Sequence, residues 1–254
     1  MAQAKDDSPR LTRRRLLLTA GSVAPLATVA SAAVIRGEMP WQEGESQRPP
    51  EAATPQGEAH YQFFTPAEAA FIEAAVAQLI PADDLGPGAL EAGVPVFIDR
   101  QLAGDYGKGA RWYMQGPWAK GEQTQGYQSR LTPAGLYRLA IREIDAAVAR
   151  EAGAPAFARL AAADRDTWLH RMEDGKLELP TADAKDFFKT LLQNTQEGFW
   201  ADPIYGGNRD MAGWKLIGFP GARYDHTPFV SRHGEAYPLP PVGLMGRPQW
   251  LRKE

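Results

Sequence analysis

The chain has no cysteine and only four histidines among its 254 residues. The absence of cysteine excludes disulfide bonds, iron–sulfur ligation by this chain and the Cys-x-x-Cys-His attachment of a c-type haem. The sequence also lacks the glycine-rich nucleotide-binding loops, the zinc motif His-Glu-x-x-His and the serine nucleophile motif Gly-x-Ser-x-Gly. We therefore predict that this chain holds neither a cofactor nor a metal.

The net charge does not indicate a nucleic-acid partner, and the length of the apolar runs after Ala33 does not indicate a membrane-spanning domain. The formal net charge is −3, which gives no reason to expect a nucleic-acid partner. Beyond Ala33, no uncharged apolar run approaches the ~20 residues that a spanning helix requires. Hydrophobic residues make up 44% of the chain, so we expect a soluble domain with a sizeable core after Ala33.

The first 32 residues have the order of an export signal. Arg13, Arg14 and Arg15 precede an uncharged stretch that runs to Ala33 and ends in small residues. This order predicts a twin-arginine signal peptide that is cut after Ala32, and therefore a periplasmic destination. The twin-arginine (Tat) translocase carries proteins that are already folded, often with a cofactor bound. Because this chain shows no cofactor site, we predict that the cargo needing this route is a partner.

Two alternatives stay open for this segment. Arg15 makes the position of the arginine pair ambiguous, and Leu16 and Leu18 stand where many such signals carry Phe and Lys. General secretory export is therefore the first alternative. The second is that residues 16–33 are retained as a membrane anchor, although their short length and small-residue end favour cleavage.

The rest of the sequence predicts one helical domain between two irregular segments. Residues 33–60 are rich in Glu, Gln, Pro and Ala and are expected to form a linker or extended arm, with Trp41 as a candidate docking point. The helical domain, residues 61–221, begins at a capping pattern formed by Thr65, Pro66 and Glu68. Apolar residues at helical spacing predict helices over residues 66–80, 95–103, 133–152, 165–174 and 182–198, with Asp164 and Thr181 capping the last two.

Helical periodicity is missing from residues 105–130 and again after Gly198. Residues 199–254 are dense in Gly, Pro and aromatic side chains, and only residues 214–217 alternate as a strand does. Irregular segments of this length are usually functional or lie on a partner. The predicted fold class is mainly α: a single helical domain with a long irregular N-terminal arm and an irregular C-terminal tail at residues 222–254.

Three short motifs could carry chemistry, but we interpret each as a surface turn. Residues 104–109 are glycine-rich, yet no strand precedes them as in a phosphate-binding loop. Asp83 and Asp84 follow a helix end, where they could do acid–base work or hold calcium. His226 and His233 are seven positions apart without a helical pattern, which is weak support for zinc.

The most distinctive stretch is residues 199–221. Gly206, Gly207 and Asn208 tolerate left-handed backbone angles, and the large aromatic residues around them are costly to expose to water. Three interpretations compete: a turn packed within the chain, a partner interface and an active site. Aromatic residues beside an arginine are typical anchors of interfaces. The residues expected at a partner interface are Trp200, Asp202, Tyr205, Asn208, Arg209 and Trp214.

Short motifs across the helical domain carry a resemblance to a known family. They lie at residues 63–68, 79–83, 86–89, 92–94, 97–102, 116–117 and 202–221. Over these motifs the chain resembles the small subunit, subunit 3, of membrane-bound gluconate 2-dehydrogenase. That family is shared with the small subunits of FAD-dependent fructose, sorbitol and glucose dehydrogenases.

The resemblance implies a three-part enzyme. A large flavoprotein subunit holds FAD and oxidises a sugar or sugar acid, and a membrane-bound multihaem cytochrome c subunit passes the electrons to ubiquinone. The small subunit brings no known redox group, and its signal is thought to export the signal-less large subunit. The family supplies no catalytic residue for this chain.

Two classes of function follow. The first is a non-catalytic accessory subunit that exports, matures and stabilises a flavin dehydrogenase. The alternative is an independent periplasmic enzyme or binding protein with a site near Asp83, Asp84, Asp202 or His226. A neighbouring gene for a flavoprotein with a dinucleotide fingerprint and no signal peptide would favour the first.

Overall fold

The computed structural model describes residues 61–119 and 121–244. In these ranges the chain forms seven α-helices, short 3-10 turns and no strand, which confirms the mainly α fold class. The helices are α2 (Pro66–Leu79), α3 (Val94–Ala103), α4 (Asp105–Lys108), α5 (Pro133–Glu151), α6 (Ala162–Glu173), α7 (Ala184–Trp200) and α8 (Ala212–Ile217). The arginines of the export signal, the cut after Ala32 and the arm at residues 33–60 lie outside the described residues.

Helix α2 begins at the capping pattern that the sequence predicts. The Glu68 N–H donates to Thr65 Oγ1 at 3.4 Å, and the Thr65 N–H donates to Glu68 Oε2 at 2.8 Å. Pro66 occupies the first turn, where its missing N–H costs nothing. These bonds satisfy backbone groups that a helix start leaves without partners.

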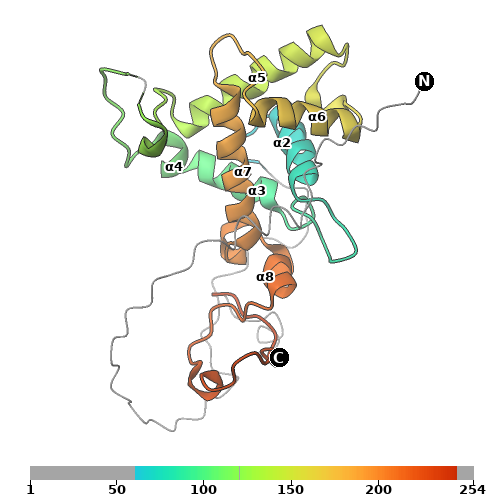
Figure 1. Cartoon of the computed structure of the whole chain (residues 1–254), viewed down its shortest axis with the longest axis vertical. Helices are drawn as coiled ribbons and strands as arrows, with labels where there is room; N and C mark the ends of the chain where they lie inside the picture. Colours follow the sequence, from blue (N-terminus) through green and yellow to red (C-terminus); the bar gives the residue numbers. More distant parts are fainter. Residues whose placement is uncertain (1–60, 120, 245–254) are drawn as a thin grey trace, which may run out of the picture.

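Helix α7 runs through the middle of the body and contacts α3, α5 and α6, and then α8 beyond its end (Figure 1). Its inner face is fully or nearly fully buried at Phe187, Phe188, Leu191 and Phe199. The Phe187 ring packs edge-on against Tyr137 of α5, with 5.3 Å between the ring centroids. Each such side chain contributes about 1.5–3 kcal/mol by leaving water, so this face anchors α7 in the core.

A chain of buried hydroxyl and amide groups joins three helices. Asn194 of α7 donates from Nδ2 to the Tyr137 hydroxyl of α5 at 2.9 Å, and the Tyr106 hydroxyl of α4 donates to Asn194 Oδ1 at 3.1 Å. Burial raises the pKa of both tyrosine hydroxyls, so both stay neutral at ordinary pH. The three side chains satisfy one another's polar groups inside the core.

Several local predictions were wrong in their details. Helix α6 begins after Ala161 instead of Asp164, which lies in its first turn. Helix α7 is capped by Asp183, whose Oδ1 accepts the Asp186 N–H at 2.9 Å. The N–H of Thr181 donates to Glu143 Oε2 of α5 at 3.1 Å. The residue that the sequence predicted as a cap therefore lies before α7 and joins its loop to α5.

Two further helices lie where the sequence predicted none. The short helix α4 occupies the start of the expected loop at residues 105–130, and α8 replaces the strand-like pattern at residues 214–217. Alternation over so few residues cannot distinguish a strand from one helical turn. None of the helices in the described ranges combines the length and the apolar content of a membrane span.

Candidate partner interface

The segment after α7 is built around one buried asparagine. Asn208 is 0% exposed and has a left-handed backbone, with φ of 46°. Its Nδ2 donates to the Ala201 carbonyl at 2.8 Å, and its Oδ1 accepts the Gly213 N–H at 2.8 Å. Asn208 thereby ties the end of α7 to the start of α8. The side chain predicted for a partner contact is used by the fold of its own chain.

Close packing of backbone explains the glycines in the same motif. A Cβ on Gly207 would overlap the carbonyl of Gly198 in α7, and a Cβ on Gly213 would overlap the carbonyl of Phe199. Glycine is therefore the residue that lets both segments approach α7. This packing explains two of the glycines in the motif at residues 202–221, Gly207 and Gly213.

Trp214 and Asp202 are also engaged within the chain. Trp214 is 6% exposed, and its Nε1 donates to the Trp200 carbonyl at 2.7 Å. Asp202 Oδ1 accepts the Ile204 N–H at 3.0 Å, and its Oδ2 accepts the Leu244 N–H at 2.7 Å. Asp202 therefore shapes the turn after α7 and holds the tail against it.

The same segment also carries exposed apolar side chains and an exposed cation. Tyr205 is 51% exposed and Ile204 is 44% exposed, and Phe219 adds a second aromatic side chain at 44%. The Arg209 side chain is exposed, while its backbone N–H donates to the Ala92 carbonyl at 2.8 Å. Of the six predicted interface residues, Tyr205 and Arg209 present their side chains to solvent, and these two stay predictions as partner contacts.

Replacing Asn208 with alanine is expected to lower the free energy of unfolding by about 2–5 kcal/mol. Two hydrogen bonds are lost, each worth about 0.5–1.5 kcal/mol net, and alanine in the left-handed region adds about 1–2 kcal/mol. Urea unfolding of the purified chain measures the change. Asn208→Gly is the matched control, because it removes the same bonds without the backbone strain and should be milder. Unchanged stability in Asn208→Ala would contradict this role.

The residues proposed for an independent active site are engaged separately. Asp83 Oδ1 accepts the Leu85 N–H at 2.9 Å, as in a surface turn, and Asp84 is exposed beside it. The His226 ring lies 5.9 Å from the Tyr237 ring in the tail. Across the described parts of the chain, no group of three or more histidine, aspartate or glutamate side chains could hold a metal ion.

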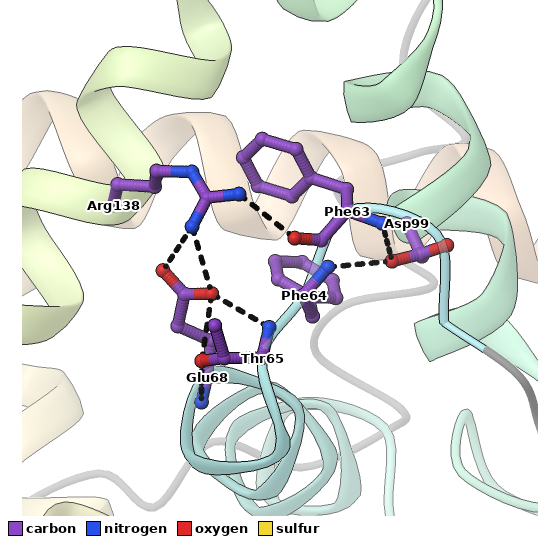
Figure 2. Close-up of polar contacts among 6 residues, drawn as sticks. All are labelled: Phe63, Phe64, Thr65, Glu68, Asp99 and Arg138. Atoms are coloured by element: carbon purple, nitrogen blue, oxygen red, sulfur yellow. Dashed lines mark hydrogen bonds and ion pairs between the residues drawn. The ribbon is translucent and has the colours of Figure 1, made fainter.

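A second group of contacts holds the start of the helical body (Figure 2). Asp99 of α3 is 1% exposed, and its Oδ2 accepts the Gln62 N–H at 2.7 Å. Its Oδ1 accepts the N–H groups of Phe63 and Phe64, both at 2.9 Å. Both carboxylate oxygens are thus engaged by backbone donors. We call Asp99 and these three donors the entry clamp.

Arg138 of α5 supports the entry clamp from the other side. Its Nη2 donates to the Phe63 carbonyl at 2.9 Å, and its Nη1 pairs with Glu68 Oε1 at 3.1 Å (Figure 2). Its guanidinium also lies over the Phe63 ring, 4.3 Å from the centroid. The motifs at residues 63–68 and 97–102 therefore meet in space and determine where the chain enters the helical body.

Sequence reasoning noted these motifs but assigned Asp99 no role. A usable signal was present in the sequence. Asp99 directly follows the apolar residues Phe97 and Ile98, and all three are buried in α3. An aspartate is almost never fully buried unless its charge is satisfied. Such a residue predicts a partner, although its three backbone donors lie 35 to 37 positions away in the sequence.

Comparison with known proteins gives one match. The family described as gluconate 2-dehydrogenase subunit 3 matches residues 66–221, which is more than half of the chain. No curated protein and no solved structure matches. The matched region begins at the first residue of α2 and ends just after α8, so it contains the entry clamp's Asp99 and the whole segment around Asn208. The chain belongs to the gluconate 2-dehydrogenase subunit 3 family.

Proposed function

We propose that this chain is the non-catalytic small subunit of a periplasmic, membrane-associated, FAD-dependent sugar or sugar-acid dehydrogenase. The observation that carries the proposal is the family match over residues 66–221. Membership implies association with other subunits of a dehydrogenase complex. The arginine-rich export segment adds a role in bringing a folded flavoprotein across the membrane.

The proposed division of labour comes from the family, and the composition of this chain agrees with it. The chain has no cysteine for haem attachment or iron–sulfur ligation. By the family resemblance, FAD would belong to the large subunit and haem c to a membrane-bound cytochrome subunit, with the sugar pocket on the large subunit. The small subunit exports, matures and stabilises that flavoprotein.

The exposed face after α7 is the proposed contact with the large subunit. Tyr205, Ile204 and Phe219 are apolar side chains exposed to water on a segment whose buried residues hold it rigidly. Exposed apolar groups on a rigid support suit an interface, since little ordering entropy is lost on binding.

Purification of the full chain from its native cells, followed by mass spectrometry and a flavin absorbance spectrum, tests the proposal. A flavoprotein and a multihaem cytochrome c should co-purify in fixed proportion. Recovery of the chain alone, under conditions that preserve membrane complexes, would contradict the accessory-subunit function.

Tyr205→Ala is expected to weaken binding of the large subunit about thirtyfold or more. Truncating a central interface side chain typically costs about 2 kcal/mol or more, and about 1.4 kcal/mol is tenfold in affinity. Binding of the two purified subunits measures the loss, with the melting temperature of the chain as a parallel readout.

Tyr113→Ala is the matched control for Tyr205→Ala, because Tyr113 is an exposed tyrosine on the loop between α4 and α5. It should leave affinity unchanged. Unchanged affinity in Tyr205→Ala together with a lower melting temperature would show that Tyr205 serves the fold and not the partner.

A further inference from the structure

The chain between α4 and α5 carries exposed aromatic side chains. Tyr113 is 80% exposed and Trp118 is 44% exposed, and the Trp112 ring is also partly open to water. We call residues 108–132 the aromatic loop. In Figure 1 this loop, drawn in green, projects at the left of the body beside α4, whereas α8 lies at the lower end of the body. The aromatic loop is therefore a surface separate from the proposed contact with the large subunit.

Ring contacts hold the base of the aromatic loop. The Trp112 ring lies edge-on to Tyr106 of α4, with 5.9 Å between the centroids, and its centroid is 5.3 Å from that of Tyr127. The Tyr127 hydroxyl donates to the Leu131 carbonyl at 2.8 Å. Tyr106 in turn belongs to the polar chain that joins α4 to α7. The exposed rings are thus carried by a supported loop, which loses little ordering entropy on binding.

The aromatic loop is also basic. Residues 106–121 contain three cations and no acid, although the whole chain has a formal net charge of −3. Of these cations, Lys108 and Arg111 are exposed. Neither forms an ion pair with any residue in the described ranges. Exposed cations beside exposed rings suit a partner that is negatively charged at its surface and apolar beneath.

The residue types favour a lipid surface over a protein partner. Every large apolar side chain of the aromatic loop that is exposed is a Trp or a Tyr, and each of these has a polar group at the edge of its ring. Such rings are enriched at the headgroup level of membranes, where nearby Lys and Arg attract anionic lipids. Protein interfaces, in contrast, are depleted in lysine.

We propose that the aromatic loop binds the headgroup region of an anionic lipid surface. Tyr113 and Trp118 enter the interface between headgroups and acyl chains, and Lys108 and Arg111 pair with lipid phosphates. Apolar burial and attraction to anionic lipids together set the strength of such binding. The inference goes beyond the proposed function, because this chain supplies the whole surface without its partners.

A fluorophore on the full chain tests where lipid contacts it. The natural chain has no cysteine, so Gln115→Cys in the loop and Ala152→Cys after α5 each accept one environment-sensitive label. Both positions are exposed, and the 19 residues of α5 separate Ala152 from the loop by ~28 Å. With vesicles of phosphatidylglycerol and phosphatidylcholine, we expect a blue shift and quenching by spin-labelled lipid at position 115 and not at position 152.

Two double variants identify the side chains that bind. Lys108→Gln/Arg111→Gln should weaken vesicle binding about thirtyfold, because each cation near an anionic surface is worth about fivefold. Tyr113→Ala/Trp118→Ala should weaken it by at least about tenfold. Arg142→Gln is the control, since it removes an exposed cation of α5 outside the loop and should leave binding unchanged. The melting temperature of each variant reports whether its fold is kept.

Three outcomes would overturn the proposal. The first is no quenching at position 115, or equal quenching at positions 115 and 152. The second is vesicle binding that both double variants leave unchanged, which would assign the lipid contact to another segment. The third is a label at position 115 that responds to the purified large or cytochrome subunit and not to vesicles, which would place a protein on the loop. None of these outcomes affects the co-purification test of the proposed function.

Discussion

Replacing Arg13, Arg14 and Arg15 with lysine is expected to leave both this chain and its flavoprotein partner in the cytoplasm. Lysine keeps the positive charge but removes the planar guanidinium groups with five fixed donors that a twin-arginine receptor would recognise. Because the large subunit is proposed to cross the membrane only with this chain, periplasmic dehydrogenase activity should fall to background. Fractionation, followed by immunodetection of both subunits and an activity assay of the periplasm, measures the result.

Arg10→Lys is the matched control for this experiment, since it changes an arginine of the same segment outside the triplet. It should not affect export. Normal periplasmic activity in the triple lysine variant would contradict the twin-arginine route and favour general secretory export. Export of the flavoprotein in the absence of this chain would contradict the carrier function alone and leave the route unaffected.

Asp99→Ala is expected to lower the free energy of unfolding by about 3 kcal/mol or more. Three N–H groups lose their acceptor together, and each donor left without a partner costs about 1–3 kcal/mol when buried. Part of this cost is recovered because Gln62 is exposed and can turn to water. For a chain of this size the melting temperature should fall by about 6–12 °C.

Two further variants sharpen the test. Asp99→Asn keeps the shape but removes the charge and turns one acceptor into a donor, so it should be intermediate in stability. Asp84→Ala removes an exposed aspartate and should lie within about 0.5 kcal/mol of the natural chain. If Asp99→Ala were no more damaging than Asp84→Ala, the entry clamp would not contribute to stability.

Local signals in the sequence were sufficient to predict a helix start where the residues that form its capping hydrogen bonds are close together in the sequence. Thr65 and Glu68 are three positions apart and satisfy each other directly, so the start of α2 was predictable. Asp164 and Thr181 show the limit of such signals. Both are good capping residues, but Thr181 bonds to Glu143 of another helix and the cap moves to Asp183. Tertiary contacts of this kind leave no local pattern.

The same distinction between local signals and tertiary contacts applies to the candidate interface. Composition identified residues 199–221 as a special segment but could not distinguish side chains that support it from side chains that face outward. Asn208 and Trp214 are buried by contacts with α7, whereas Tyr205 is half exposed. The buried and the exposed side chains differ in their position relative to the C-terminal end of α7, and that position depends on how α7 packs in the core.

The sequence by itself determined the helical class, the start of the body at Thr65 and the family, because periodicity, capping and motifs depend on residues close together in the chain. Only the tertiary structure decided that Asp99 holds residues 62–64 and that Asn208 is structural. Each of these depends on groups from separate segments brought together by the burial of apolar surface, and such proximity cannot be read from spacing along the chain.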